Sequence, residues 1–219
     1  MSHNATTEKL LEYSLKCARE SGFISNVYFS FNPLKRYIVR SNLIKIISAV
    51  QHVKNKNDVL DFGPGFGILL PPLSEIYCRI VGLDVDENQV IAAAKIIKDH
   101  SIPNVNLVCR SPEVEFDEFD DESFDCIVAD NVLEHINYHD KILQNFYRIL
   151  RADGLLIISL PSENALYRLF ESKNDGHVLR RSKEIHSLLR KIGKDFIEVG
   201  SLDTPPIFIA RMFSKSSEI

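Results

Sequence analysis

Residues 59–69 read V-L-D-F-G-P-G-F-G-I-L, and this stretch decides the fold that we expect for the chain. A short apolar run is followed by an acid, by glycines at alternate positions and by apolar residues again. Such a run predicts a buried parallel strand, and the segment from Phe66 onward predicts the helix after it. Because glycine has no Cβ, the turn between them can bend sharply and let a ligand approach the backbone. We expect N–H groups at the helix start to face that ligand.

The spacing of the glycines restricts the kinds of ligand that we expect this turn to bind. A dinucleotide fingerprint requires G-x-G-x-x-G, but Ile68 occupies the position of the third glycine. A P-loop would need Gly-Lys followed by Ser or Thr, which is absent. Asp61 lies two residues before Gly63, where a carboxylate would repel a pyrophosphate and attract a ligand with an ammonium group.

A second acid follows the next buried run. Residues 79–83 predict a strand, and this strand ends at Asp84. In nucleotide-binding βαβ units an acid about 20 residues past the first glycine accepts hydrogen bonds from ribose hydroxyls, and Asp84 has that spacing. Asp86 begins a capping-box pattern for the following helix, which leaves Asp84 available to a ligand.

Strand and helix patterns alternate along the chain. We expect helices at residues 6–21, 34–53, 86–100, 138–150 and 182–192, strands at 105–109, 124–129, 155–160, 195–199 and 207–212, and an irregular insert at 161–181. This alternation predicts an α/β fold whose mostly parallel sheet carries helices on both faces. Pro205 and Pro206 leave too little chain for a helical crossover, so the last two strands should form an antiparallel hairpin.

Three segments resemble one known family. The pattern D-x-G-x-G-x-G at residues 61–67 resembles motif I of the class I S-adenosylmethionine (SAM)-dependent methyltransferases. The segment V-L-E-H at 132–135 and the strand L-R-A-D-G-L-L-I-I-S-L-P at 150–161 are similar to later family segments, although Ala152 and Asp153 depart from the family's L-x-P-G-G. The resemblance covers residues 58–161 and points to small-molecule members of the type 11 kind.

The resemblance implies a fold and a domain plan. The fold is a Rossmann-like, seven-stranded, mostly parallel sheet with a C-terminal antiparallel hairpin. Residues 1–219 would form a single methyltransferase domain. Within it, 1–54 would be an N-terminal helical lid, 55–161 the SAM-binding core, and 162–219 the substrate insert and closing strands.

The resemblance also implies which residues bind the cofactor SAM. Asp61 and the backbone of residues 63–67 would face its methionine part, and Asp84 would hold the ribose. Ser111 stands where many members carry an acid that contacts adenine, with Glu113 nearby. The implied cofactor-binding residues are Asp61, Gly63, Pro64, Gly65, Gly67, Asp84, Val85, Ser111, Asp130 and Asn131.

SAM is a sulfonium cation whose methyl group moves in one in-line displacement, so the protein mainly positions the reactants and excludes water. A base is needed only where the acceptor must lose a proton. His135 is the candidate base because it follows the fourth strand at the ligand edge of the sheet; packing or a local hydrogen bond is the alternative. His139 lies four residues further on, but no third ligand is nearby, so we expect no metal.

Two groups of residues are candidates for holding the acceptor. Tyr28 and Tyr37 belong to an aromatic stretch that could line a lid, or could simply pack between helices. His177 and Arg180 belong to a basic cluster that could hold an anionic acceptor, or could form a solvated loop.

Composition limits the partners and the compartment. No apolar run approaches the roughly 18 residues of a membrane span, and the polar start predicts no signal peptide. The four cysteines are scattered, which is typical of reduced thiols in a cytoplasmic protein. The acidic stretch at 113–125 argues against a nucleic-acid partner. We expect a monomer or homodimer whose partner is a small-molecule methyl acceptor.

These patterns predict a SAM-dependent methyltransferase that releases S-adenosyl-L-homocysteine and methylates a small-molecule or lipid-linked metabolite. One alternative is an NAD-type oxidoreductase, which Ile68 disfavours. The other is a SAM- or nucleoside-binding protein without turnover, which would keep the same pocket.

Overall fold

The computed structural model describes residues 3–23, 28–136, 138–161, 182–193, 196–201 and 208–215. The described strands form one seven-stranded sheet in the order β3-β2-β1-β4-β5-β7-β6. Their bounds are β1 Asp58–Phe62, β2 Arg79–Asp84, β3 Val105–Cys109, β4 Phe124–Asp130, β5 Leu150–Pro161, β6 Phe196–Ser201 and β7 Phe208–Lys215. The predicted insert at 161–181 lies almost entirely outside the described residues.

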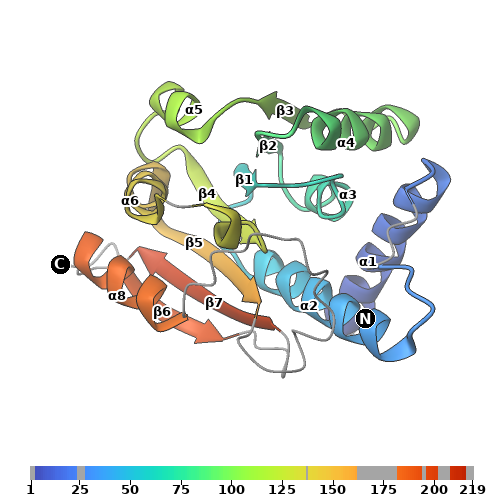
Figure 1. Cartoon of the computed structure of the whole chain (residues 1–219), viewed down its shortest axis with the longest axis horizontal. Helices are drawn as coiled ribbons and strands as arrows, with labels where there is room; N and C mark the ends of the chain where they lie inside the picture. The colour runs from blue at the N-terminus through green and yellow to red at the C-terminus, as the bar shows by residue number, and fades with distance from the viewer. Residues whose placement is uncertain are drawn as a thin grey trace.

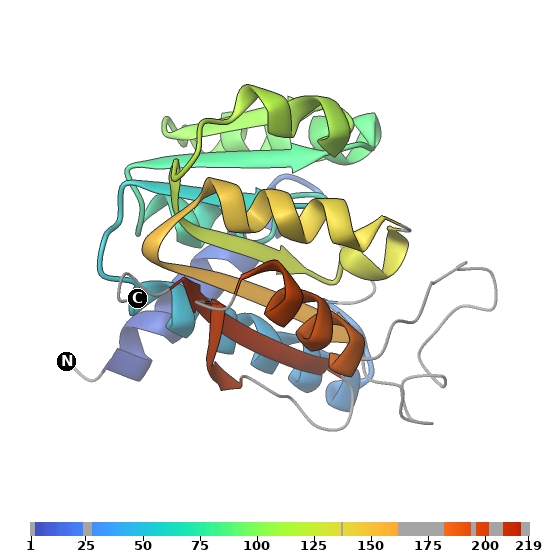
Figure 2. The same ribbon diagram turned by 90° about the vertical axis from the view of Figure 1, so that its left-hand side faces the viewer.

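Helices cover both faces of the sheet, as the alternation of elements predicted (Figure 1). One face carries α1 His3–Glu20, α2 Pro33–Gln51, α3 Leu70–Ser74 and α4 Glu87–Asp99. The other carries α5 Pro112–Glu118, α6 His139–Ile149 and α8 Ser182–Ile192, and Figure 2 shows that face toward the viewer. None of the helices in the described ranges combines the length and the apolar character that crossing a membrane requires.

The strand pairing confirms a mostly parallel sheet with an antiparallel C-terminal hairpin. Strand β1 pairs in parallel with both β2 and β4, and β4 pairs in parallel with β5. Strand β7 runs antiparallel to β5 and to β6. The chain leaves β1 toward β2 and β3 and returns on the other side at β4, so the direction of winding reverses between β1 and β4. In open α/β sheets a ligand binds outside the carboxyl ends of the strands at such a point.

The helix that we expected from Phe66 starts later, at Leu70, and lasts only five residues. The reason lies in the backbone of the glycines, since Gly65 and Gly67 have φ values of 56° and 88°, in the left-handed region. An α-helix requires negative φ at every residue, so it cannot begin before the last of them. Pro71 and Pro72 fit the first turn of a helix, where their missing N–H groups leave no helical bond unmade.

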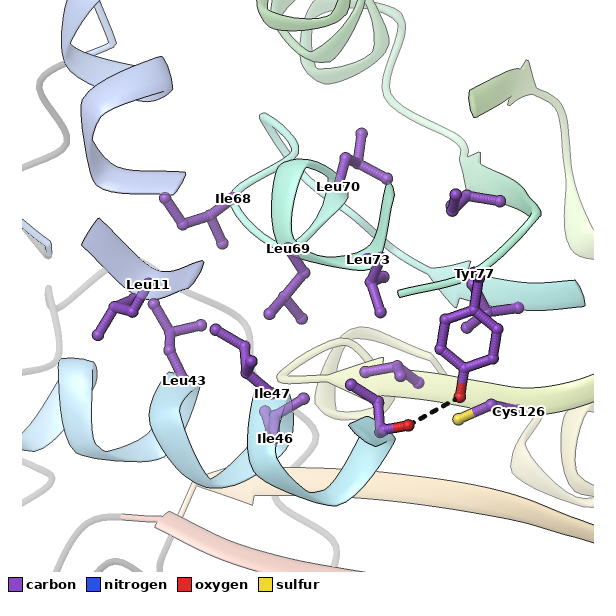
Figure 3. Close-up of a cluster of buried hydrophobic side chains, with 14 of the residues drawn as sticks. Leu11, Leu43, Ile46, Ile47, Ile68, Leu69, Leu70, Leu73, Tyr77 and Cys126 are labelled. Atoms are coloured by element: carbon purple, nitrogen blue, oxygen red, sulfur yellow. Dashed lines mark hydrogen bonds between the residues drawn. The ribbon is translucent and has the colours of Figure 1, made fainter. Parts of the chain in front are cut away.

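Two apolar layers hold the sheet and helices together. Alternate residues of β1 point to opposite layers: Val59 packs with α1, α2 and α3, whereas Leu60 and Phe62 pack with α6. Figure 3 shows the first layer, where Ile68 and Leu69 from the end of the glycine turn meet Leu11 of α1 and the apolar face of α2. The end of the glycine turn is therefore fixed in the core.

Candidate functional site

A cavity of about 190 Å³ opens at the carboxyl ends of β1 and β4. It lies at the reversal point of the sheet, where the topology predicts a ligand. Seven of the residues proposed from sequence line it together with three apolar neighbours. The lining residues are Tyr28, Asp61, Gly63, Pro64, Gly65, Phe66, Ile68, Leu69, Asp130 and Asn131.

The glycine turn allows two segments to approach each other closely. Gly63 has a φ of 72°, and a Cβ built on it would lie 2.3 Å from Cγ2 of Val132. Only glycine accepts both that conformation and that contact. The N–H groups of Gly63 and Gly67 donate to the carbonyls of Leu83 and Pro64, at 2.9 Å each. These two N–H groups are therefore engaged within the protein, in contrast to our expectation of free donors at a helix start.

Asp84 holds the middle of the turn. Its Oδ2 accepts a hydrogen bond of 3.0 Å from the N–H of Gly65, and its Oδ1 accepts one of 3.0 Å from the N–H of Asp86. Asp86 in turn caps α4, with its side chain accepting from the N–H of Asn88 at 2.9 Å. Asp84 is half-buried at the end of β2, beside the cavity rather than among its lining residues.

Asp61 is a buried carboxyl group, and no described residue supplies a counter-charge in its cavity. Its side chain is 2% exposed, and its Oδ2 has no hydrogen-bond partner among the described residues. Burial, followed by the negative charges of Asp130 and Asp84, raises the pKa of Asp61 to about 8. The lining residues that belong to the described part of the chain include no Lys, Arg or His. Since an isolated buried carboxylate is costly, the cavity favours a ligand that brings positive charge.

Asp130 shares this cavity and anchors α2 to the sheet. Its Oδ1 accepts from Nδ2 of Asn42 at 3.0 Å and from Nδ2 of Asn131 at 2.9 Å. Asn42 also donates to Oγ of Ser159 on the neighbouring strand β5 at 3.4 Å. Burial raises the pKa of Asp130, and its hydrogen bonds with Ser159 and Asn42 lower it in part. Asp130 thus keeps a fixed position whether or not it carries a proton.

Tyr28 covers the cavity from the side of α1 and α2. Its ring meets Phe66 edge-on, with 5.5 Å between ring centroids, and Phe23 stacks on Phe66 at 6.2 Å. Burial, then the charges of Asp130 and Asp61, raises the pKa of the Tyr28 hydroxyl. The phenol therefore remains neutral and can donate a hydrogen bond into the cavity.

The other proposed residues in the described part of the chain are not among those that line this cavity. Val85 and Tyr37 are exposed by 65% and 69%. Ser111 is the half-buried N-cap of α5, and His135 is an exposed residue at the end of the 3-10 helix η1, Leu133–His135. His177 and Arg180, as well as the side chain of Glu113, lie outside the described residues.

Three residues at the site were missed by sequence reasoning. Asn42 is a polar residue on the otherwise apolar buried face of α2, and that contrast was a usable signal. Val132, which packs over Gly63, had no distinguishing pattern. Glu134 is 4% exposed with Oε2 unpartnered in the described structure, and burial, with Asp130 nearby, raises its pKa to about 8.

The fold and the site together define a class of protein. A reversed strand β7 closes an otherwise parallel sheet, and a glycine turn flanked by Asp61 and Asp84 lies at its carboxyl edge. The buried carboxylate suits a cationic ligand, and the acid at the end of β2 suits a ribose. This is the arrangement of the class I methyltransferases whose cofactor is SAM.

Residues 60–158 match the family model described as "Methyltransferase domain". Over 81% of its length the chain is 26% identical to the ubiquinone biosynthesis O-methyltransferase of Pelagibacter ubique, of which it covers 74%. Over 63% of its length it is 31% identical to the mitochondrial ubiquinone biosynthesis O-methyltransferase of Mus musculus, of which it covers 38%. The chain therefore spans much less than half of this mitochondrial relative.

The fold also matches solved structures. A SAM-dependent methyltransferase from Aquifex aeolicus aligns with a TM-score of 0.64 at 16% identity, over 92% of this chain and 98% of that one. A likeness at that identity shows the fold. Together with the family match, it confirms the class I SAM-dependent methyltransferase predicted from residues 58–161.

Proposed function

We propose that this protein transfers the methyl group of SAM to an oxygen atom of a small-molecule or lipid-linked metabolite. The carrying observation is Asp61, a carboxyl group 2% exposed at a cavity whose described lining holds no cation. The choice of oxygen is supported by the relatives, which are named as ubiquinone biosynthesis O-methyltransferases.

The proposed binding mode divides SAM between the cavity and its rim. About 190 Å³ is less than the roughly 300–1,000 Å³ of a pocket that encloses a whole ligand, so the cavity takes the amino-acid end. Asp61 and Asp130 attract its ammonium group, and Asn131 lies beside them. Asp84 would hold the ribose, Val85 would flank the adenine, and Ser111 could accept a hydrogen bond from it.

The proposed reaction is an in-line displacement. The bond between the methyl carbon and the sulfonium sulfur breaks as a bond from that carbon to the acceptor oxygen forms, and neutral S-adenosyl-L-homocysteine leaves. The hydroxyl proton of the acceptor passes to a base, for which we propose His135. Tyr28 is proposed to contact the acceptor, and Tyr37, His177 and Arg180 are further candidates for binding it.

Calorimetric titration separates this proposal from a dinucleotide site. We expect SAM and S-adenosyl-L-homocysteine to bind and NAD not to bind, because the NAD pyrophosphate would meet Asp61. Tight NAD binding with no SAM binding would reject the proposal and favour the oxidoreductase alternative.

Methyl transfer needs its own measurement, because a binding protein without turnover would pass the titration. Hydroxylated acceptors are incubated with methyl-labelled SAM, and labelled product is counted. Tyr28→Ala should raise the acceptor KM with little loss of thermal stability, and His135→Ala should lower kcat. SAM binding without any labelled product across the acceptor set would favour the non-catalytic alternative.

A further inference from the structure

A second surface, away from the SAM cavity, has an unusual charge. Residues 21–57 contain six Lys and Arg residues and no Asp or Glu, although the whole chain has a formal net charge of −4. This segment includes the turn at 28–32 and all of α2. Its positive charge is thus a local property, and local fields of this kind attract anionic partners.

Two arginines of this segment, together with Arg19 just before it, line one open cleft. Arg19 of α1, Arg36 and Arg40 of α2, and the ring of Phe29 surround a space of about 500 Å³. The guanidinium of Arg19 lies 5.3 Å from the centroid of the Phe29 ring. Among the described residues, these arginines make one ion pair, between Arg40 and Glu12 at 3.6 Å, and Glu12 is largely exposed. Three cations around one space favour an anion there.

Large apolar side chains project beside the cleft. Phe31 is fully exposed at 103%, and Leu34 is exposed by 55%. Asn32 between them caps α2, since its Oδ1 accepts from the N–H groups of Leu34 and Lys35 at 2.9 and 3.2 Å. The cap fixes the turn, so Phe31 points outward because of the backbone geometry. Phe31 and Leu34 thus add an exposed apolar component next in sequence to the arginines of α2.

We propose that this docking surface, made of Arg19, Phe29, Phe31, Leu34, Arg36 and Arg40, binds a lipid bilayer that carries anionic headgroups. Phosphate headgroups match the arginines, and Phe31 and Leu34 enter the boundary between headgroups and acyl chains. A protein partner would need a pocket shaped for Phe31, whereas a bilayer accepts a projecting ring without one. Tyr28 lines the SAM cavity and the next residue, Phe29, lines the arginine cleft, so a bound bilayer lies next to the site.

Vesicle sedimentation tests the proposal. The wild-type chain is mixed with vesicles of phosphatidylcholine alone and of phosphatidylcholine with phosphatidylglycerol, at low and high salt. We expect binding to the anionic vesicles that weakens with salt, and little binding to the neutral ones. Phe31→Asp and Arg19→Glu should each raise the Kd for anionic vesicles about tenfold.

Matched variants outside the surface control for general effects. Ile91 of α4 is exposed by 60%, close to the 55% of Leu34, so Ile91→Ser is the control for Leu34→Ser. Lys98 lies in the last turn of α4 as Arg19 does in the last turn of α1, so Lys98→Glu is the control for Arg19→Glu. Thermal melting and SAM titration verify that each variant is folded. The controls should bind vesicles like the wild type.

Three results would overturn the proposal. The first is equal binding to neutral and anionic vesicles, or no binding to either kind of vesicle by a chain that still binds SAM. If the chain bound no vesicles, the surface would be assigned to a protein partner. The second is a loss of vesicle binding in the controls as large as in the surface variants. The third is full release by soluble glycerol phosphate, which would make the cleft a site for a free anion. Vesicle binding is measured without SAM or acceptor, so it is independent of the proposed methyl transfer.

Discussion

Asp125 and Asp61 are equally buried, each 2% exposed, but they lie at opposite edges of the sheet. At the amino edge, Oδ2 of Asp125 accepts from the N–H groups of Asn57 and Asp58 at 2.9 Å each and pairs with Arg151 at 3.0 Å. At the carboxyl edge, Oδ2 of Asp61 has no partner in the described structure.

The same chemical group thus contributes differently at the two edges. A buried carboxylate with a cation and two N–H donors stabilises the native state, because removing its partners would leave the charge uncompensated. A buried carboxylate without them destabilises the native state until a cation arrives. The contrast teaches that one edge of this sheet serves stability and the other is prepared for a ligand.

Substitution at the carboxyl edge should have the largest effect on binding. Asp61→Asn removes the negative charge but keeps the side-chain shape, so we expect the Kd for SAM to rise by two to three orders of magnitude, about 3–4 kcal/mol. The free energy of unfolding without ligand should change little at pH 7, because Asp61, whose pKa is about 8 in the folded state, is mostly protonated there and Asn is a neutral group of the same shape. Calorimetry measures the Kd and urea denaturation measures the free energy of unfolding. An unchanged Kd would contradict the assignment of the carboxyl edge to ligand binding.

The matching substitution at the amino edge should affect stability and leave SAM affinity unchanged. Asp125→Asn removes one of the two carboxylates that pair with Arg151, the other being Asp58, and weakens two charge-assisted hydrogen bonds. We therefore expect the free energy of unfolding to fall by about 2 kcal/mol. The Kd for SAM should stay the same, because Asp125 is at the far edge. If this variant lost SAM affinity while keeping its stability, the division between the edges would be wrong.

The pH dependence of stability should show an effect no larger than those of the two substitutions above. The pKa of Asp61 is about 8 in the folded state, whereas an unfolded chain releases this proton near pH 4. Between those values the folded state binds more protons, so its stability falls as pH rises, by about 2 kcal/mol between pH 6 and 8. Glu134, whose pKa is also about 8, acts in the same direction.

Urea denaturation at several pH values measures this slope. It should be smaller in Asp61→Asn, and saturating SAM should flatten it further, since a bound cation favours the ionised carboxylate. Stability that rises from pH 6 to 8 in the ligand-free wild type would contradict the assigned protonation of Asp61.

The smallest expected effect compares two glycines of the same turn. Both have left-handed φ, but a Cβ on Gly63 would meet Val132 at 2.3 Å, whereas on Gly65 its nearest neighbour would be 3.8 Å away. Gly63→Ala should therefore lower the free energy of unfolding by about 1 kcal/mol more than Gly65→Ala. Adding Val132→Ala should recover part of the difference in denaturation experiments; equal losses in the two single variants would show that packing over Gly63 contributes nothing.

The fold was predictable because its strands carry strong local patterns. The expected third strand at 105–109 has the observed bounds of β3. The proline before this short apolar run and the serine after it limit where the strand can begin and end. Asp61 and Asp84 were found from their spacing to Gly63. The late start of α3 was missed because left-handed glycines extend the turn beyond Phe66.

The rest of the site depends on contacts between distant segments. Asn42 and Asp130 are 88 positions apart in sequence, and only the packing of α2 on the sheet brings them together. The close approach of Val132 to Gly63 likewise requires β1 and β4 to be neighbours in the sheet. Local patterns therefore identified the acids, whereas the groups that hold them in place needed the tertiary structure.

Asp84 accepts hydrogen bonds from the N–H groups of Gly65 and Asp86. These two bonds affect both the association rate and the affinity of a nucleoside at this site. They select one rotamer of the carboxylate before any ligand arrives, and each of its oxygens still has a lone pair to offer. A flexible side chain loses about 0.5–1.5 kcal/mol of conformational entropy when a ligand immobilises it. Here that loss occurs during folding, so a ribose would meet a rigid acceptor and the adenosine half would dock without waiting for a side-chain rearrangement.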